Sequence, residues 1–174
     1  MSTRTVKARK ADAKRAARMG NADRAWRRIG MRLKRGVDKR NVGCVRATWG
    51  EVRRSLIRNP CTSLDRTLFP IVDGRGNTAL ISVAWVRFRS GGDRRRFQKV
   101  IDVYGTGDIK PLAASLLGMA DVRFTGRYYH SIAKGRRLTV AEAEAVRGTF
   151  DAKVLDGFAE IAAELPRPPG RRRR

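Results

Sequence analysis

Positive charge is the feature that most constrains what this chain can fold into. Its 174 residues include 40 Lys and Arg but 16 Asp and Glu, which gives a net charge of +24. Like charges in such excess repel each other in a compact state, and they exceed what solubility requires. Basic side chains displace counterions from phosphates, so we expect the chain to bind DNA or RNA in a salt-dependent way.

The charge is concentrated towards the two ends of the chain. Residues 1–40 contain 15 Lys and Arg and 3 Asp, and the last four residues are all arginine. We expect 1–40 to be a largely disordered basic arm with one helix over 22–34, where Trp26, Ile29 and Leu33 share a face. Residues 166–174, rich in Pro and Arg, should form a second disordered tail. The segment 41–165 between them has the length and apolar content of one domain.

Few side chains offer catalytic or metal chemistry. The chain has a single histidine, His130, and its two cysteines, Cys44 and Cys61, are 17 positions apart with no CxxC motif. This pattern predicts neither a zinc site nor a disulfide framework, and it leaves no histidine-paired nucleophile. We therefore expect a non-enzymatic protein without a cofactor or metal. No long apolar segment occurs in the sequence, so a membrane partner is not expected.

The middle of the chain alternates between strand and turn signals. Turn residues at 73–77 separate apolar runs at 68–72 and 78–89, which predicts a hairpin. The segment 150–165 has helical spacing, but its first residues also alternate, so helix and strand both stay open. The other expected elements are strands at 42–49, 97–104 and 122–129, a short helix at 108–117 that ends at Gly118, and a helix from the capping box Thr139 to Glu142 as far as Gly148.

Strands with one helix between the third and the fourth follow the order of an OB-fold barrel. Four stretches resemble the bacterial single-stranded-DNA-binding protein family in order and spacing: Ile81-Ser82-Val83-Ala84, FQKVIDVYG at 97–105, PLAASLL at 111–117 and VRFTGR at 122–127. The resemblance covers roughly residues 41–131. It implies an all-β fold with short helices, in which a five-stranded OB-fold barrel is flanked by the basic tails.

The resemblance also implies that bases of single-stranded DNA stack on aromatic side chains while Lys and Arg follow the phosphates. Tyr104 matches the family's stacking phenylalanine before a glycine, and Phe97 lies where the family has a tryptophan. One extra residue between them puts the two on opposite faces of a strand unless a bulge intervenes. Tyr129 and Trp85 complete the candidate platforms, although barrel aromatics are also common in cores and Trp49 fits either place. The candidate phosphate contacts are Lys99, Arg87, Arg89, Arg94, Arg95, Arg96 and Arg127.

The expected partner is single-stranded DNA, in the cytoplasm or nucleoid of a bacterial, plasmid or phage source, with RNA as an open alternative. Family members act in DNA replication, repair and recombination and pair their barrels, which implies a homo-oligomer, either a dimer or a tetramer. They commonly end in an acidic, apolar tip, whereas this chain ends in four arginines, which favours a mobile-element or phage version. The main alternative is a viral or structural protein that coats packaged nucleic acid.

Overall fold

The computed structural model describes residues 3–40 and 43–168, and its centre is an antiparallel sheet of six strands. The strand order is β1-β4-β5-β8-β7, and β2 pairs with a different part of β4 than β1 does. A separate two-stranded sheet joins β3 (Thr48–Trp49) to β6 (Gly107–Ile109). The strands of the large sheet are β1 (Met31–Leu33), β2 (Val37–Lys39), β4 (Ser63–Asp73), β5 (Thr78–Arg87), β7 (Tyr129–Lys134) and β8 (Arg137–Arg147).

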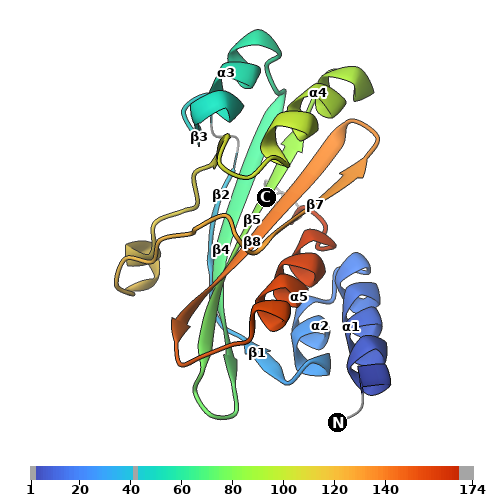
Figure 1. Cartoon of the computed structure of the whole chain (residues 1–174), viewed down its shortest axis with the longest axis vertical. Coiled ribbons are helices and arrows are strands. Elements are labelled where there is room, and N and C mark those ends of the chain that lie inside the picture. Colours follow the sequence, from blue (N-terminus) through green and yellow to red (C-terminus); the bar gives the residue numbers. More distant parts are fainter. Residues whose placement is uncertain (1–2, 41–42, 169–174) are drawn as a thin grey trace, which may run out of the picture.

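Helices cover the two faces of the large sheet towards opposite ends of the molecule (Figure 1). The first face carries α1 (Thr3–Arg18), α2 (Ala22–Arg28) and α5 (Ala152–Ala163). The second face carries α3 (Gly50–Arg58) and α4 (Gly91–Ile101). The segment around the short 3-10 helix η1 (Ala114–Leu117) covers another part of the second face.

The central strand β5 is apolar along almost its whole length because both of its faces are covered. Ile81, Val83 and Trp85 pack with the helices of the first face, whereas Leu80 and Val86 belong to clusters on the second. Alternate side chains of a strand point to opposite faces, so two layers of cover require a continuous apolar run. The hairpin predicted from 68–72 and 78–89 is confirmed as the antiparallel pair of β4 and β5.

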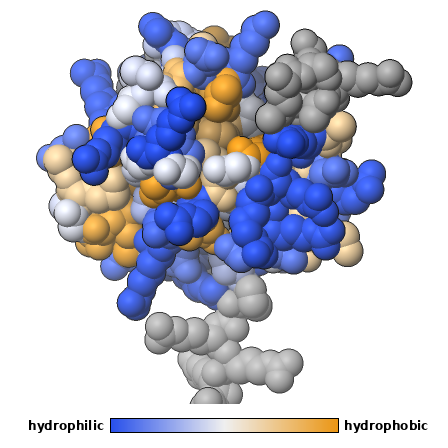
Figure 2. All heavy atoms as spheres, turned by 90° about the horizontal axis from the view of Figure 1, so that it is seen from below, coloured by the Kyte–Doolittle hydropathy of each residue, from blue (hydrophilic) through white to orange (hydrophobic). Residues whose placement is uncertain are grey.

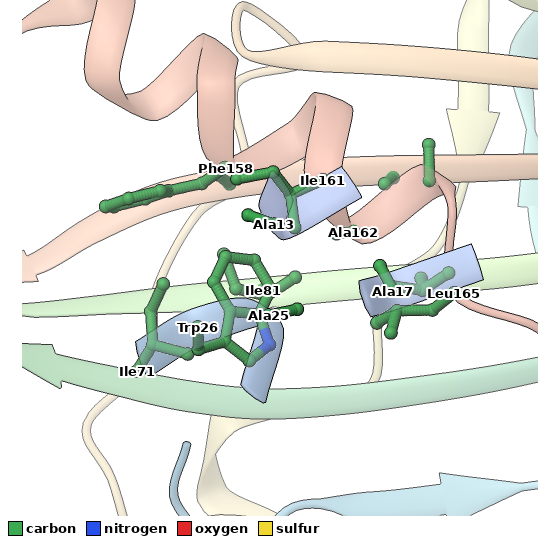
Figure 3. Close-up of a cluster of buried hydrophobic side chains, with 14 of the residues drawn as sticks. Ala13, Ala17, Ala25, Trp26, Ile71, Ile81, Phe158, Ile161, Ala162 and Leu165 are labelled. Carbon is green, nitrogen blue, oxygen red and sulfur yellow. The ribbon is translucent and has the colours of Figure 1, made fainter. Parts of the chain in front are cut away.

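The N-terminal helices belong to the core of the first face, as the close-up in Figure 3 shows. Trp26 is fully buried, and its ring lies 5.9 Å from that of Phe69 and 6.0 Å from that of Phe158. Ala13 and Ala17 of α1 are fully buried in the same cluster, because their small side chains let the helix backbone pack closely. The expectation of a largely disordered arm over 1–40 is therefore wrong for the described residues, and the packing shows no boundary at residue 40.

The charge of α1 is partly neutralised inside the molecule. Lys10 and Lys14 lie 3.2 and 3.7 Å from the carboxylate of Glu160 in α5, and Arg18 lies 3.0 Å from Glu164. Exposed pairs of this kind contribute little to stability individually, but all three connect the same two helices. They explain how a basic helix can pack against the core without facing another basic surface.

Neither sheet closes into a barrel within the part of the chain that the structure describes. The large sheet is open, with β7 at one edge and β1 and β2 at the other, and three helices pack on its first face. The fold is mainly β with antiparallel sheets and short helices, as expected, but the expected five-stranded OB-fold barrel is not what forms.

Several local predictions also need correction. The segment 97–104 is not a strand but the second half of α4 and the turn after it, and the capping box at Thr139 lies in strand β8 instead of a helix. Residues 122–128 form no regular strand, so β7 begins where that predicted strand ends. The predicted helix over 22–34 stops at Arg28, because Gly30 takes a left-handed φ of 78° and turns the chain into β1.

Other local predictions are confirmed or decided. Gly118 ends η1 in the left-handed conformation, as a glycine after a helix commonly does. This helix is shorter than the one expected over 108–117, because its first residues form β6 and an extended segment. The open choice for 150–165 is decided in favour of a helix, α5, whose Leu155, Phe158 and Ile161 face the core.

A disulfide bond joins Cys44 to Cys61, which corrects the expectation that the two cysteines form no such bond. It connects the segment before β3 to the segment before β4, and α3 lies between the two half-cystines in sequence. Spacing alone could not show this pairing, because 17 positions of intervening sequence allow the two ends of the loop to lie close or far apart.

A hydrogen bond and an ion pair connect the segment after α5 to the large sheet. The indole Nε1 of Trp85 donates a 2.9 Å hydrogen bond to the carbonyl oxygen of Leu165, and Arg167 forms an ion pair with the buried Asp65. The first residues of the expected tail over 166–174 are thus ordered, while Arg171 to Arg174 lie outside the described residues. No helix in the described ranges is long and apolar enough to span a membrane.

Candidate nucleic-acid interface

Positive charge gathers at the end of the sheet where β4 begins and β5 ends. Three segments meet there, 43–63, 86–101 and 133–138, since Ser63 is opposite Arg87 and Arg87 is opposite Arg137 in the strand register. They contain thirteen Lys and Arg against two acidic residues, Glu51 and Asp93. We call this surface of α3, α4 and the β7–β8 turn the basic end.

Helix α4 carries much of this charge because its sequence is amphipathic. Ser90 caps its first turn, with its hydroxyl oxygen accepting a 3.1 Å hydrogen bond from the Asp93 amide. Phe97 and Ile101 are buried against α3 and the sheet, which leaves the basic side chains on the opposite side. Of the predicted phosphate contacts, Arg87, Arg89, Arg95, Arg96 and Lys99 are exposed at this end, and Arg127 is exposed in the loop before β7.

Two of the predicted phosphate contacts, Arg94 and Arg96, already have partners in the protein. The Arg94 guanidinium donates a 3.0 Å hydrogen bond to the Gly135 carbonyl and a 2.8 Å hydrogen bond to the side chain of Gln98. Arg96 forms a 2.8 Å ion pair with Asp93. Arg94 therefore fixes α4 to the β7–β8 turn, while the other exposed cations present most of the charge to a ligand.

A cavity of about 290 Å³ opens on the second face beside the basic end, between α4, β6, β7, β8 and the loop over 123–128. Two exposed aromatic side chains line it: Tyr104 is 72% exposed and Trp49 is 49% exposed. Large aromatic side chains bury well, so two of them exposed at one cavity indicate a surface that receives a ligand. Arg123 is exposed at the same cavity.

Backbone geometry holds Trp49 at this position. Strand β3 pairs with β6, which places Trp49 opposite Asp108. A Cβ atom on Gly107 would overlap the carbonyl of Trp49, and Gly107 also has a φ of 122°. Only glycine fits this close contact between the strands.

The inner wall of the cavity is acidic. Glu142 of β8 is 3% exposed, and burial together with hydrogen bonding to Asp108 raises its pKa to about 10. Burial also raises the pKa of Asp108, an effect that hydrogen bonding to Glu142 opposes. The two carboxyl groups therefore share at least one proton at neutral pH, since two adjacent carboxylates in a poorly solvated site repel each other.

A third carboxylate holds two hydroxyl groups at the edge of the cavity. Asp102 Oδ1 accepts hydrogen bonds of 2.8 Å from the Tyr129 hydroxyl and 2.7 Å from the Ser131 hydroxyl. Burial and the nearby Asp102 raise the pKa of Tyr129, so its phenol stays protonated. This cluster connects the end of α4 to the edge strand β7.

The structure separates the four predicted aromatic platforms. Tyr104 is exposed, and Tyr129 is half-buried with its hydroxyl bound to Asp102. Phe97 is fully buried next to Phe88, and Trp85 is 7% exposed in the core of the first face. Neither Phe97 nor Trp85 offers a ring face to a base, because α4 replaces the expected strand and helices cover both faces of β5.

Sequence reasoning missed the acidic wall and left Trp49 undecided. Glu142 was placed in a helix cap, and Asp108 was expected only to begin the short helix over 108–117. A signal did exist for a strand here, since Glu142 and Glu144 alternate with Ala141, Ala143 and Ala145 in the pattern of a strand with one buried face. Its approach to Asp108 depends on the fold and carries no local signal.

The remaining chemistry of the described residues is limited. No group of three or more His, Cys, Asp or Glu side chains in these ranges could hold a metal ion. A second hollow of about 560 Å³ lies between α1, α5 and β1, with Ile29, Met31, Phe150 and Val154 in its lining. Its lining also includes Lys7, Arg9, Lys10 and Lys153, but no exposed aromatic ring like those of Tyr104 and Trp49.

The family resemblance of the sequence has no independent support from known proteins. A scan against protein-family models found no match, and neither did searches of curated proteins and of solved structures. The interpretation of this surface therefore depends on its own geometry, an exposed pair of aromatic rings beside a concentration of cations.

Proposed function

We propose that this protein binds single-stranded nucleic acid, with phosphates on the basic end and bases against Tyr104 and Trp49. The observation that carries the proposal is the position of these two exposed rings at one cavity, directly beside α4. Aromatic rings accept any base by stacking, and nearby cations hold the backbone.

The stacking contact is what distinguishes a single strand from a duplex. A duplex has the higher charge density, so electrostatic attraction alone would favour it. In a duplex, base faces are covered by their neighbours and cannot reach Tyr104 or Trp49. A preference for single strands would therefore report stacking, and it does not depend on an OB-fold barrel. DNA is the proposed ligand, and RNA is the outcome that a direct comparison would reveal.

The test is a competition between single-stranded DNA, duplex DNA and single-stranded RNA of equal length at physiological salt. We expect the single strand to win over the duplex, and Tyr104→Ala to weaken single-strand binding by about 1 to 3 kcal/mol. Tyr104→Phe keeps the ring and should bind like the wild type, while Leu116→Ala, at another exposed apolar side chain, is a matched control. Equal or tighter duplex binding would refute the proposal.

The salt dependence tests whether phosphates lie on the basic end. Replacing Arg53, Arg54 and Arg58 of α3 by Gln should flatten the plot of log affinity against log salt by up to about 2 units, since each phosphate contact contributes roughly 0.7. A matched control replaces Arg24, Arg28 and Arg32, which are exposed near the other end of the molecule. Figure 2 shows many hydrophilic side chains at that lower end, among apolar ones. Each variant loses three positive charges. Equal flattening in both would show that charge acts without a defined site.

The assembly state and cellular role also remain proposals. We propose a dimer or tetramer, and light scattering on the full chain over a range of concentrations tests it directly. A particle much larger than a tetramer, formed with nucleic acid, would instead favour the coating-protein alternative. Since disulfide bonds persist mainly in oxidising compartments, the state of Cys44 and Cys61 in cells bears on the proposed cytoplasmic or nucleoid location.

A further inference from the structure

The acidic wall of the cavity is unusual in a chain of net charge +24, and the proposed stacking contacts do not use it. Asp102, Asp108 and Glu142 all line the cavity. A phosphate would be repelled there, so the inner cavity must serve a ligand group without negative charge. Its volume of about 290 Å³ is close to the lower end of the range for small-ligand sites, which suits a single ring system better than a long chain.

Glu142 has a buried carboxyl oxygen, Oε1, that receives no hydrogen bond from an amide, hydroxyl or basic group of the described residues. Within these ranges, the only hydrogen bond of this side chain is the shared proton with Asp108. Two other carboxylates nearby, Glu144 and Asp102, do have hydrogen-bond donors. Glu144 Oε1 accepts from the amide and the hydroxyl of Thr125, at 2.8 and 2.5 Å, and Asp102 accepts from two hydroxyl groups. Buried acceptors are normally paired, so an unpaired one that lines a cavity points to a donor on a ligand.

The carboxyl pair fixes which hydrogen-bonding groups the wall can present. Asp108 and Glu142 are close enough to interact by hydrogen bonding, which requires a shared proton. Two carboxyl groups with one proton offer more acceptor oxygens than donor hydrogens. The wall therefore matches a neutral ring edge that is rich in N–H groups.

We propose that this wall binds the amino-bearing edge of one unpaired nucleobase, such as cytosine, while Tyr104 and Trp49 cover its ring at the mouth of the cavity. This inference rests on the proposed function, because the strand at the basic end delivers the base. An exocyclic amino group supplies two N–H donors to the wall. Uracil and thymine have one ring N–H between two carbonyl oxygens, which would meet further oxygen atoms. Extruded bases are held in this way, by hydrogen bonds to an edge and stacking on the faces.

The test compares oligo(dC) with oligo(dU) of equal length, since the two bases have the same ring size and differ at the exocyclic amino group. With the full chain at neutral pH and fixed salt, we expect oligo(dC) to bind about tenfold tighter than oligo(dU). Glu142→Gln replaces carboxyl oxygen by an amide N–H group and should abolish this preference. Glu144→Gln makes the same change of side chain two positions away but keeps the Oε1 acceptor for Thr125, so it should keep the preference.

The possible outcomes separate this inference from the proposed function. If the wild type binds both oligonucleotides equally, or if Glu142→Gln keeps the wild-type preference, the inference is wrong while single-strand binding stands. A protein that binds neither oligonucleotide overturns both. Asp108→Asn is a second variant that removes the shared proton, and it should also lose the preference if Glu142→Gln does not fold. Circular dichroism and thermal melting establish folding for each variant.

Discussion

The Tyr129 hydroxyl donates a 2.8 Å hydrogen bond to Asp102, and this contact ties the edge strand β7 to the end of α4. β7 pairs on one side with β8, and its other side is an edge of the large sheet. The Tyr129–Asp102 bond is thus one of the contacts that fix the position of the strand beside the cavity. Its removal should loosen the cavity wall without disturbing the centre of the sheet.

Tyr129→Phe should lower the free energy of unfolding by about 1.5 to 3 kcal/mol, because one hydrogen bond to a charged acceptor is lost. Asp102 keeps the Ser131 hydroxyl as a donor, so its carboxylate is not left unpaired. Urea unfolding measures the change. A loss above about 3 kcal/mol would mean that the phenol supports more of the fold than this one bond.

The raised pKa of Glu142 predicts a specific dependence of stability on pH. In the unfolded chain this carboxyl ionises near its ordinary value of 4.5, whereas in the folded protein it ionises at about 10. The folded state thus binds more protons between these values, and the free energy of unfolding should fall as pH rises through that window. Glu142 faces Asp108, Glu144 and, across the strand pair, Tyr129, so these groups titrate in the same environment.

Glu142→Gln should remove most of this decline. Thermal melts of wild type and variant at several pH values provide the measurement, and their difference cancels the general effect of charge repulsion among the many basic residues. The variant should gain stability relative to wild type as pH increases from 5 to 9, values chosen within that window. Parallel curves would show that Glu142 ionises normally in the folded protein.

Removing the disulfide should destabilise the basic end. Replacing Cys44 and Cys61 by serine releases a loop of 17 positions, which should lower the free energy of unfolding by about 3 kcal/mol. A reductant should have the same effect on the wild type and none on the double variant, which makes the variant its own control. Wild-type stability that does not respond to complete reduction would contradict this prediction.

Trp26→Ala tests whether the N-terminal helices are integral to the fold. The side chain is fully buried between β4 and α5, so truncation should cost about 3 to 5 kcal/mol. Met19→Ala, at a side chain 80% exposed in the same region, should change stability by less than about 0.5 kcal/mol. Chemical unfolding of both variants measures the two changes in the free energy of unfolding. Equally small changes would indicate that 1–40 is a separate arm after all.

Sequence reasoning predicted those elements whose signal is local. The β4–β5 hairpin follows from the turn residues around Gly74 and Gly76 between apolar runs, and the helical option for α5 follows from the spacing of Leu155, Phe158 and Ile161. For Tyr104, platform and core were both open, and its exposure comes from the turn after α4 and not from a barrel strand.

Segments whose residue spacing fits both a helix and a strand were assigned wrongly. In α4, Phe97 and Ile101 are spaced for a helix, and Ser90 with Asp93 is a cap, but the apolar residues after Phe97 also suit a strand. In β8, Thr139 and Glu142 match a capping box, yet Leu138, Val140 and Ala143 pair across a sheet. Local spacing cannot choose between such options, because the choice depends on which surfaces the rest of the chain covers.

The contacts that build the cavity could not be predicted, because they join distant parts of the chain. Asp108 and Glu142 are far apart in sequence and meet through the pairing of β3 with β6 and the register of β8. The sequence did not show whether Trp49 is buried or exposed, because its exposure depends on the same pairing of β3 with β6. The disulfide is a further case, since sequence spacing does not say whether two cysteines are neighbours.

The packing of α1 and α2 against α5 sets the order in which this protein can mature on the ribosome. Trp26 is synthesised early, but Phe158 and Ile161, which complete its cluster, are added more than a hundred residues later. Until then the basic N-terminal helices lack the part of their apolar cover that α5 provides, and they lack the carboxylates of Glu160 and Glu164. The first face can therefore close only after α5 has been synthesised.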